Sequence, residues 1–204
     1  MNSPSTRKHD PSTWRNASAV YNGKAFGFRT QSGAGNSGID DRGATHFLSP
    51  NVSDAELGAA LRDTLEQTRL ILDHVEFRAF FSNEELKRNK QSWIDAQVAN
   101  MYAKSYAILR KQLAFVGVHV TNEILYLQPS NNLYGRKWIR VPDHEVKDIC
   151  ILYASDDAVI GTALREAFRR CDVLGTKMSF EGWPDDPKLD YLPPPKLTFE
   201  MPTP

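Results

Sequence analysis

The sequence has only two cysteines, Cys150 and Cys171, among its 204 residues. Two thiols are too few for a disulfide framework or a thiolate zinc site, so we expect both to be reduced and buried. Net charge is also missing, because 25 basic residues balance 25 acidic ones. This balance disfavours a general nucleic-acid binder, which uses an excess of lysine and arginine.

Long apolar runs are absent as well. No stretch reaches the ~18 apolar residues of a membrane span, and residues 1–10 lack the apolar core of a signal peptide. We therefore expect a cytoplasmic protein that binds no membrane and makes no direct contact with nucleic acid.

The composition that is present, 41% hydrophobic and 25% charged residues, is typical of a globular chain. The length suits one domain spanning residues 1–204. We expect a polar N-terminal segment (1–18), a core (19–175) and a proline-rich tail (176–204). Proline fixes φ and lacks an N–H donor, so the tail is predicted to be extended. Its apolar residues favour a strap across the domain surface, and a partly mobile tail is the alternative.

Residue patterns predict an α+β (α/β mixed) fold: a single antiparallel-rich sheet of about five to seven strands, flanked by about three helices. Ser53 and Glu56 form a capping box that opens a helix over 54–72, with Leu72 as the last apolar position of its inner face. The other predicted helices begin at Asn83 and at about Asp156. Predicted strands are 25–29, 45–48, 77–81, 115–121, 124–127, 137–141 and 147–153, and residues 31–43 are predicted to form a glycine-rich loop.

A ten-residue segment occurs twice, at 54–63 (DAELGAALRD) and 157–166 (DAVIGTALRE), and six of the ten positions are identical. Both copies place a glycine, Gly58 or Gly161, in the second helical turn. Glycine costs about 1 kcal/mol there relative to alanine, so a packing reason is expected to outweigh the loss. We interpret that reason as close approach of each helix to the sheet. A chance match between two helices rich in common helix formers is the alternative.

Motifs for catalysis are weak. Residues 33–38 fit the letters G-x-G-x-x-G, but no periodic helix follows, as a dinucleotide site requires. Asp143, Glu145 and Lys147 are the residue types of a metal-dependent nuclease, yet they share one turn rather than converging from separate strands. The histidines show no i, i+4 pair and no serine lies in a nucleophile elbow. We expect no metal and no cofactor.

Several segments resemble the family of contact-dependent growth inhibition (CDI) immunity proteins. The matching segments are 53–58 (SDAELG), 102–105 (YAKS) leading into 109–111 (LRK), 124–129 (ILYLQP), 156–161 (DDAVIG) and 164–167 (LREA), within residues 20–175. The resemblance implies a non-catalytic protein that neutralises the C-terminal toxin domain of a cognate effector in a one-to-one complex. It also implies that the toxin is commonly a nuclease, often one that cleaves tRNA.

A nuclease cleft is basic because its substrate is a polyanion, so carboxylates of an inhibitor can take the place of phosphates. The candidate toxin-binding residues are therefore acidic, with one aromatic anchor: Asp40, Asp41, Asp143, Glu145, Trp183, Asp185 and Asp186. The alternative function is a small metal-dependent nuclease or hydrolase that uses Asp143, Glu145 and Lys147. The oligomeric state is left open by the sequence.

Overall fold

The computed structural model describes residues 13–133, 137–140, 148–173, 178–181, 183 and 189. The elements in chain order are β1 (Arg15–Tyr21), β2 (Phe26–Ala34), β3 (Asn36–Ile39), β4 (Thr45–Leu48), α1 (Asp54–Glu66), α2 (His74–Phe80), α3 (Asn83–Asn100), α4 (Tyr106–Leu109), β5 (Ala114–Thr121), β6 (Ile124–Leu133), β7 (Lys137–Arg140), β8 (Ile149–Leu152) and α5 (Asp157–Arg169). All the named strands belong to one antiparallel sheet, which confirms the predicted α+β class.

Two long strands organise the edges of the sheet. The strand order is β3-β2-β1-β5-β6-β7, and β4 also pairs with β2 while β8 also pairs with β6. Strand β2 pairs with β4 through its first half and with β3 through its second half. Strand β6 likewise pairs with β8 through its first half and with β7 through its second half. The central pair is β1 and β5, with Ser18 opposite Gly117 near its middle.

The fold repeats itself. Residues 15–71 and 114–173 each contain a hairpin, two short edge strands and a helix in the same order. After each helix the chain returns to form a parallel bridge, between Leu70 and Gly33 in the first half and between Val173 and Asn132 in the second. Because β1 and β5 are antiparallel, the halves are related by an approximate two-fold axis between these strands. The sequence repeat at 54–63 and 157–166 is therefore part of a much longer structural repeat.

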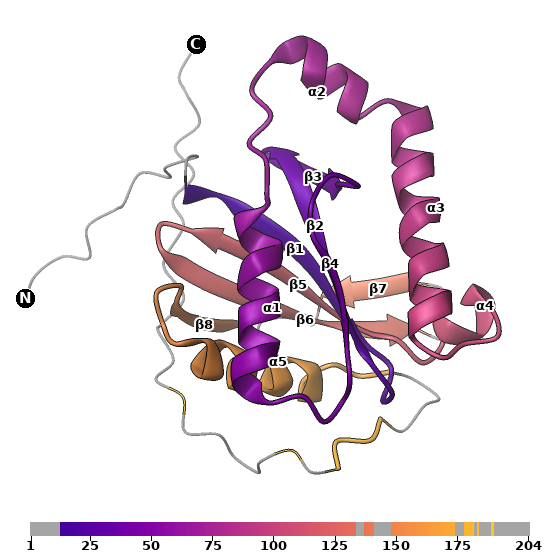
Figure 1. Cartoon of the computed structure of the whole chain (residues 1–204), viewed down its shortest axis with the longest axis vertical. Helices are drawn as coiled ribbons and strands as arrows, with labels where there is room; N and C mark the ends of the chain where they lie inside the picture. The colour runs from indigo at the N-terminus through magenta and orange to yellow at the C-terminus, as the bar shows by residue number, and fades with distance from the viewer. Residues whose placement is uncertain are drawn as a thin grey trace, which may run out of the picture.

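The repeated glycines lie where the two helices cross. A Cβ atom on Gly58 would lie 1.8 Å from the carbonyl oxygen of Asp157, and one on Gly161 would lie 2.0 Å from that of Asp54. Close approach of each helix to the sheet is thus the wrong interpretation, since each glycine faces the backbone of the other helix. Figure 1 shows α1 crossing α5 on one side of the sheet.

The sheet separates two apolar clusters, because alternate residues of a strand point to opposite faces. In β1, Ala17, Ala19 and Tyr21 face the larger cluster with α1 and α5, whereas Val20 faces the smaller one. The smaller cluster includes Trp93 of α3. In the tail, Met178, Phe180, Trp183 and Leu189 pack against the larger cluster.

Helices α2 to α4 form an insertion between the two repeated halves. We call residues 72–113 the inserted arm. In Figure 1, α2 lies above the sheet and α3 runs down its right side, with α4 at the foot of α3. Among the described residues, no helix is both long and apolar enough to cross a membrane.

Local chemistry explains where the structure differs from the prediction. Helix α2 replaces the predicted strand at 77–81, because the Asp73 carboxylate accepts from the Glu76 N–H and caps a helix there. The predicted glycine-rich loop is a hairpin of β2 and β3, turning at Gly35 with φ 77°. Strand β1 begins at Arg15, inside the segment 1–18 that was predicted to be polar, and α1 ends at Glu66 rather than at 72.

Candidate interaction site

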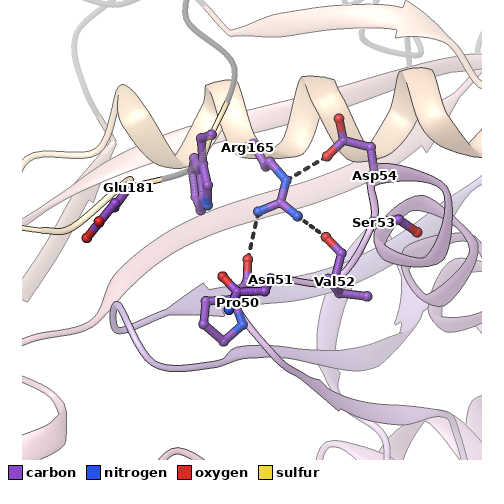
Figure 2. Close-up of a pocket in the computed structure, with 8 residues that line it drawn as sticks. Pro50, Asn51, Val52, Ser53, Asp54, Arg165 and Glu181 are labelled. Atoms are coloured by element: carbon purple, nitrogen blue, oxygen red, sulfur yellow. Dashed lines mark hydrogen bonds and ion pairs between the residues drawn. The ribbon is translucent and has the colours of Figure 1, made fainter.

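An open hollow of about 320 Å³ lies between the β4–α1 loop, α5 and the tail. Its lining residues are Pro50, Asn51, Val52, Ser53, Asp54, Arg165, Glu181 and Trp183. Figure 2 shows the guanidinium of Arg165 reaching the loop. Its Nε donates to Asp54 Oδ1 at 2.6 Å, and its Nη1 donates to the Pro50 carbonyl at 3.2 Å. Its Nη2 donates to the Val52 carbonyl.

Aromatic rings complete the surroundings of Arg165. The guanidinium carbon lies 5.2 Å from the ring centre of Phe26 and 4.9 Å from that of Trp183. All three nitrogens of the guanidinium are hydrogen-bonded within the chain, and the residue is buried. Arg165 therefore holds the β4–α1 loop onto α5, and the hollow is first of all a structural junction.

Arg62 makes the equivalent contacts in the other half of the repeat. Its Nε donates to Asp157 Oδ1 at 2.7 Å. Its Nη1 and Nη2 donate to the carbonyls of Tyr153 at 2.9 Å and Ser155 at 2.6 Å. The Tyr153 ring covers this guanidinium at 5.1 Å. The two arginines thus lock the crossed helices reciprocally, each to the loop that precedes the opposite helix.

A second network joins the β3–β4 loop to α2. Arg69 Nε donates to Asp40 Oδ2 at 2.8 Å, and its Nη1 donates to Glu76 Oε1 at 2.5 Å. The backbone N–H of Arg42 donates to Asp40 Oδ1 at 3.0 Å. Burial by itself would raise the pKa of Asp40, but hydrogen bonds from Arg69, Ser32 and the Arg42 N–H outweigh it and lower the pKa.

This lowered pKa predicts an acid-sensitive contact. The folded protein binds the Asp40 proton more weakly than the unfolded chain does. The ionised carboxylate therefore stabilises the fold at pH values above the pKa of Asp40 in the unfolded chain, and this stabilisation is lost as the pH falls through the pKa of Asp40 in the folded protein. In Asp40→Asn we expect lower stability at neutral pH and a flatter stability curve below about pH 4. Urea unfolding at pH 3 to 7 measures both.

The control is Arg69→Met, in which Asp40 stays buried but loses its cation. The pKa of Asp40 is then expected to rise, and the variant should lose less stability on acidification than the wild type does. Identical pH dependence in all three proteins would contradict the assignment of this contact.

The structure corrects two predicted surface positions. Asp40 is 1% exposed, so its carboxylate is an internal ion-pair partner rather than a surface group. Trp183 is 8% exposed and packs beside Tyr21 and Arg165, so its ring already fills the aromatic cluster of the larger core. Asp41 is partly exposed and forms an ion pair with Arg29.

The remaining predicted site residues lie outside the described residues. They are Asp143, Glu145, Asp185 and Asp186, together with Lys147 of the nuclease alternative.

Sequence reasoning missed an exposed apolar surface at the start of α2. Leu72 is 72% exposed and Val75 is 75% exposed, beside Glu76, which Arg69 holds. Leu72 was predicted to lie on the inner face of α1, but α1 ends before it. The available signal was Asp73, a helix-capping residue type that ends one periodic segment and begins another. We call Asp41, Arg42, Leu72, Val75 and Glu76 the α2 corner.

Catalytic chemistry finds little support in the described part of the chain. No group of three or more histidine, cysteine, aspartate or glutamate side chains there could hold a metal ion. Burial raises the pKa of Cys150 to about 11 and that of Cys171 to about 12. Both are free and buried, as predicted, and at neutral pH both are thiols rather than nucleophilic thiolates.

The described residues thus define an α+β protein of two repeated halves, locked by reciprocal arginines and carrying an inserted helical arm. The family pattern of CDI immunity proteins (CdiI) matches residues 15–171, and the chain belongs to this family. The resemblance found in the sequence is therefore confirmed.

Two solved structures share the fold. A protein of unknown function from Neisseria meningitidis is 23% identical with a TM-score of 0.71, covering 81% of this chain and 99% of its own. A chain of the CdiA-CT/CdiI toxin and immunity complex from Yersinia pseudotuberculosis is 20% identical with a TM-score of 0.70, covering 78% and 98%. A search of curated proteins gave no match.

Proposed function

We propose that this protein is a cytoplasmic immunity protein, which binds the C-terminal toxin domain of its cognate CDI effector one to one and blocks the active site. Membership of the CDI immunity family over residues 15–171 carries this proposal. The Yersinia neighbour supports it, since that structure is a toxin and immunity complex. The protein is proposed to act by binding alone, without catalysis, metal or cofactor.

We further propose that the toxin is a nuclease, such as a tRNase. Its cleft would be lined with cations that bind phosphates, and carboxylates of the immunity protein would occupy those positions. In the α2 corner, Arg69 already orients the Glu76 carboxylate, so less side-chain freedom is lost on binding. Asp41 is the predicted site residue that lies at this corner.

The inserted arm is the part of the chain best suited to recognition. The repeated halves provide the sheet and the crossed helices, whereas the arm between them has no equivalent in the repeat. Large exposed apolar side chains concentrate in it, namely Leu72, Val75, Tyr102 and Ile108. Apolar and aromatic side chains that are exposed in the free protein and desolvated on binding supply much of the affinity of an interface.

The test uses the full chain and the toxin domain of the effector encoded beside its gene. We expect a one-to-one complex by light scattering, with a Kd of about 1 nM or tighter. Added to the toxin in equal amount, the chain should abolish cleavage of tRNA or other nucleic acid, and EDTA should leave the complex intact. An active toxin in the presence of excess chain would refute the proposal. RNA or DNA cleavage by the chain alone, dependent on metal, would favour the hydrolase alternative.

A further inference from the structure

Tyr102 occupies a backbone conformation that its side chain does not favour. It directly follows Met101, the C-cap of α3, and has φ 55°. This position after a helix usually holds glycine, because a Cβ atom is strained in the left-handed region. The chain path is fixed by other residues: Met101 is fully buried, and the Asn22 side chain donates to its carbonyl at 2.8 Å. A glycine at 102 would suit the fold better.

The tyrosine ring adds little packing to the isolated protein, since Tyr102 is 75% exposed. A large aromatic side chain held in solvent on a strained backbone is an observation that folding does not explain. Strained residues of this kind concentrate at functional sites. Tyrosine is also enriched among the residues that dominate protein interfaces.

The chain segment that contains Tyr102 carries charges of one sign. The sequence has no carboxylate between Asp95 and Glu123, while Lys104, Arg110 and Lys111 lie in that stretch. Ile108 of α4 is also exposed, and the buried Leu109 anchors α4 to the smaller apolar cluster. We call Tyr102, Lys104, Ile108 and Arg110 the Tyr102 patch. Its complement is an apolar pocket surrounded by carboxylates.

One partner can reach both ends of the arm. Helix α3 has 18 residues, a length of about 27 Å, and separates the Tyr102 patch from the α2 corner. A standard interface covers about 800 Å² on each partner, which is a patch of similar width. A domain that contacts the α2 corner therefore has the size needed to contact the Tyr102 patch as well.

We infer that the Tyr102 patch docks the cognate toxin domain, through a toxin surface with a carboxylate-rimmed pocket for the tyrosine ring. This inference rests on the proposed function and deepens it. Because like charges repel, the patch contacts the toxin outside any cleft lined with lysine and arginine. The protein thus binds its toxin through two surfaces. Carboxylates of the α2 corner obstruct the cleft, and the basic Tyr102 patch binds the toxin beside the cleft.

The test compares two glycine substitutions that relieve the same kind of strain. Tyr102→Gly is expected to raise the melting temperature by roughly 2 °C and to weaken toxin binding at least about 30-fold. The matched control is Glu123→Gly, in the β5–β6 turn with φ 65°. It should raise the melting temperature similarly and leave the Kd unchanged. Calorimetry with the toxin domain and thermal unfolding measure both quantities.

Each other outcome points away from the inference. Tyr102→Gly that binds the toxin as tightly as the wild type overturns it, while the proposed function survives as long as the wild type binds. A lower melting temperature in Tyr102→Gly also overturns the inference, because it would show that the tyrosine ring stabilises the fold. A single-stranded RNA 20-mer or a second copy of the chain that binds the wild type but not Tyr102→Gly assigns the patch to that ligand instead. Lys104→Glu is expected to slow toxin association about tenfold at low salt.

Discussion

Gly58→Ala is expected to destabilise the protein by roughly 3 kcal/mol or more, although alanine is the better helix former by about 1 kcal/mol. The new methyl group would lie 1.8 Å from the carbonyl oxygen of Asp157, which belongs to helix backbone and cannot rotate away. The crossed helices α1 and α5 must therefore separate, and the contacts of the larger core loosen with them. Chemical denaturation monitored by circular dichroism measures the loss.

Two further variants sharpen this prediction. Gly161→Ala should cost a similar amount, because its methyl group would meet the Asp54 carbonyl at 2.0 Å. The double variant should cost less than the sum of the two, since one separation of the helices relieves both clashes. Gly117→Ala is the control: its methyl group would meet its nearest neighbour, Gln128 Cβ, at 3.7 Å, an ordinary contact. A stabilised Gly58→Ala would show that the helices do not cross at this distance.

Arg165→Met is expected to lower the free energy of unfolding by roughly 3 to 5 kcal/mol. Methionine keeps much of the apolar stem, but the Asp54 carboxylate and the carbonyls of Pro50 and Val52 lose their donors. The Arg165 side chain is only 6% exposed, so water replaces these hydrogen bonds poorly. Urea denaturation at neutral pH gives the difference directly.

The repeat supplies the control for Arg165. Arg62 makes the same set of contacts, but its side chain is 24% exposed, so Arg62→Met should cost only about 1 to 2 kcal/mol. Combining Arg165→Met with Asp54→Asn should cost less than the sum of the two, because each change already breaks the same ion pair. Equal losses in Arg62→Met and Arg165→Met would show that burial does not set the strength of the junction.

The interaction surface was less accessible to sequence reasoning than the fold. Acidic residue type alone selected Asp40, but the structure buries it against Arg69, more than twenty residues away in sequence. Conversely, Leu72 looked like a core residue because leucine fits the spacing of α1. Exposure depends on which segments pack over a residue, and a single sequence carries no direct record of that packing.

Local signals determined much of the scaffold. The capping box at Ser53 and Glu56 forms as predicted, and β4 spans the predicted residues Thr45–Leu48. Strand β1 was missed because its polar neighbours mask a segment buried at the centre of the sheet. Helix α2 was missed because the phenylalanines at 77, 80 and 81 favour a strand, whereas the Asp73 cap favours a helix.

The sequence by itself determined that this chain contains two copies of a helix with an unusual glycine, and it indicated the CDI immunity family. Only the tertiary structure decided what the glycines do, because their partners Asp157 and Asp54 lie about a hundred residues away along the chain. The same holds for the reciprocal arginines and for the exposed ring of Tyr102. Hydrogen bonding and apolar patterning within a few residues fix the elements, whereas contacts between distant elements exist only once the sheet has brought them together.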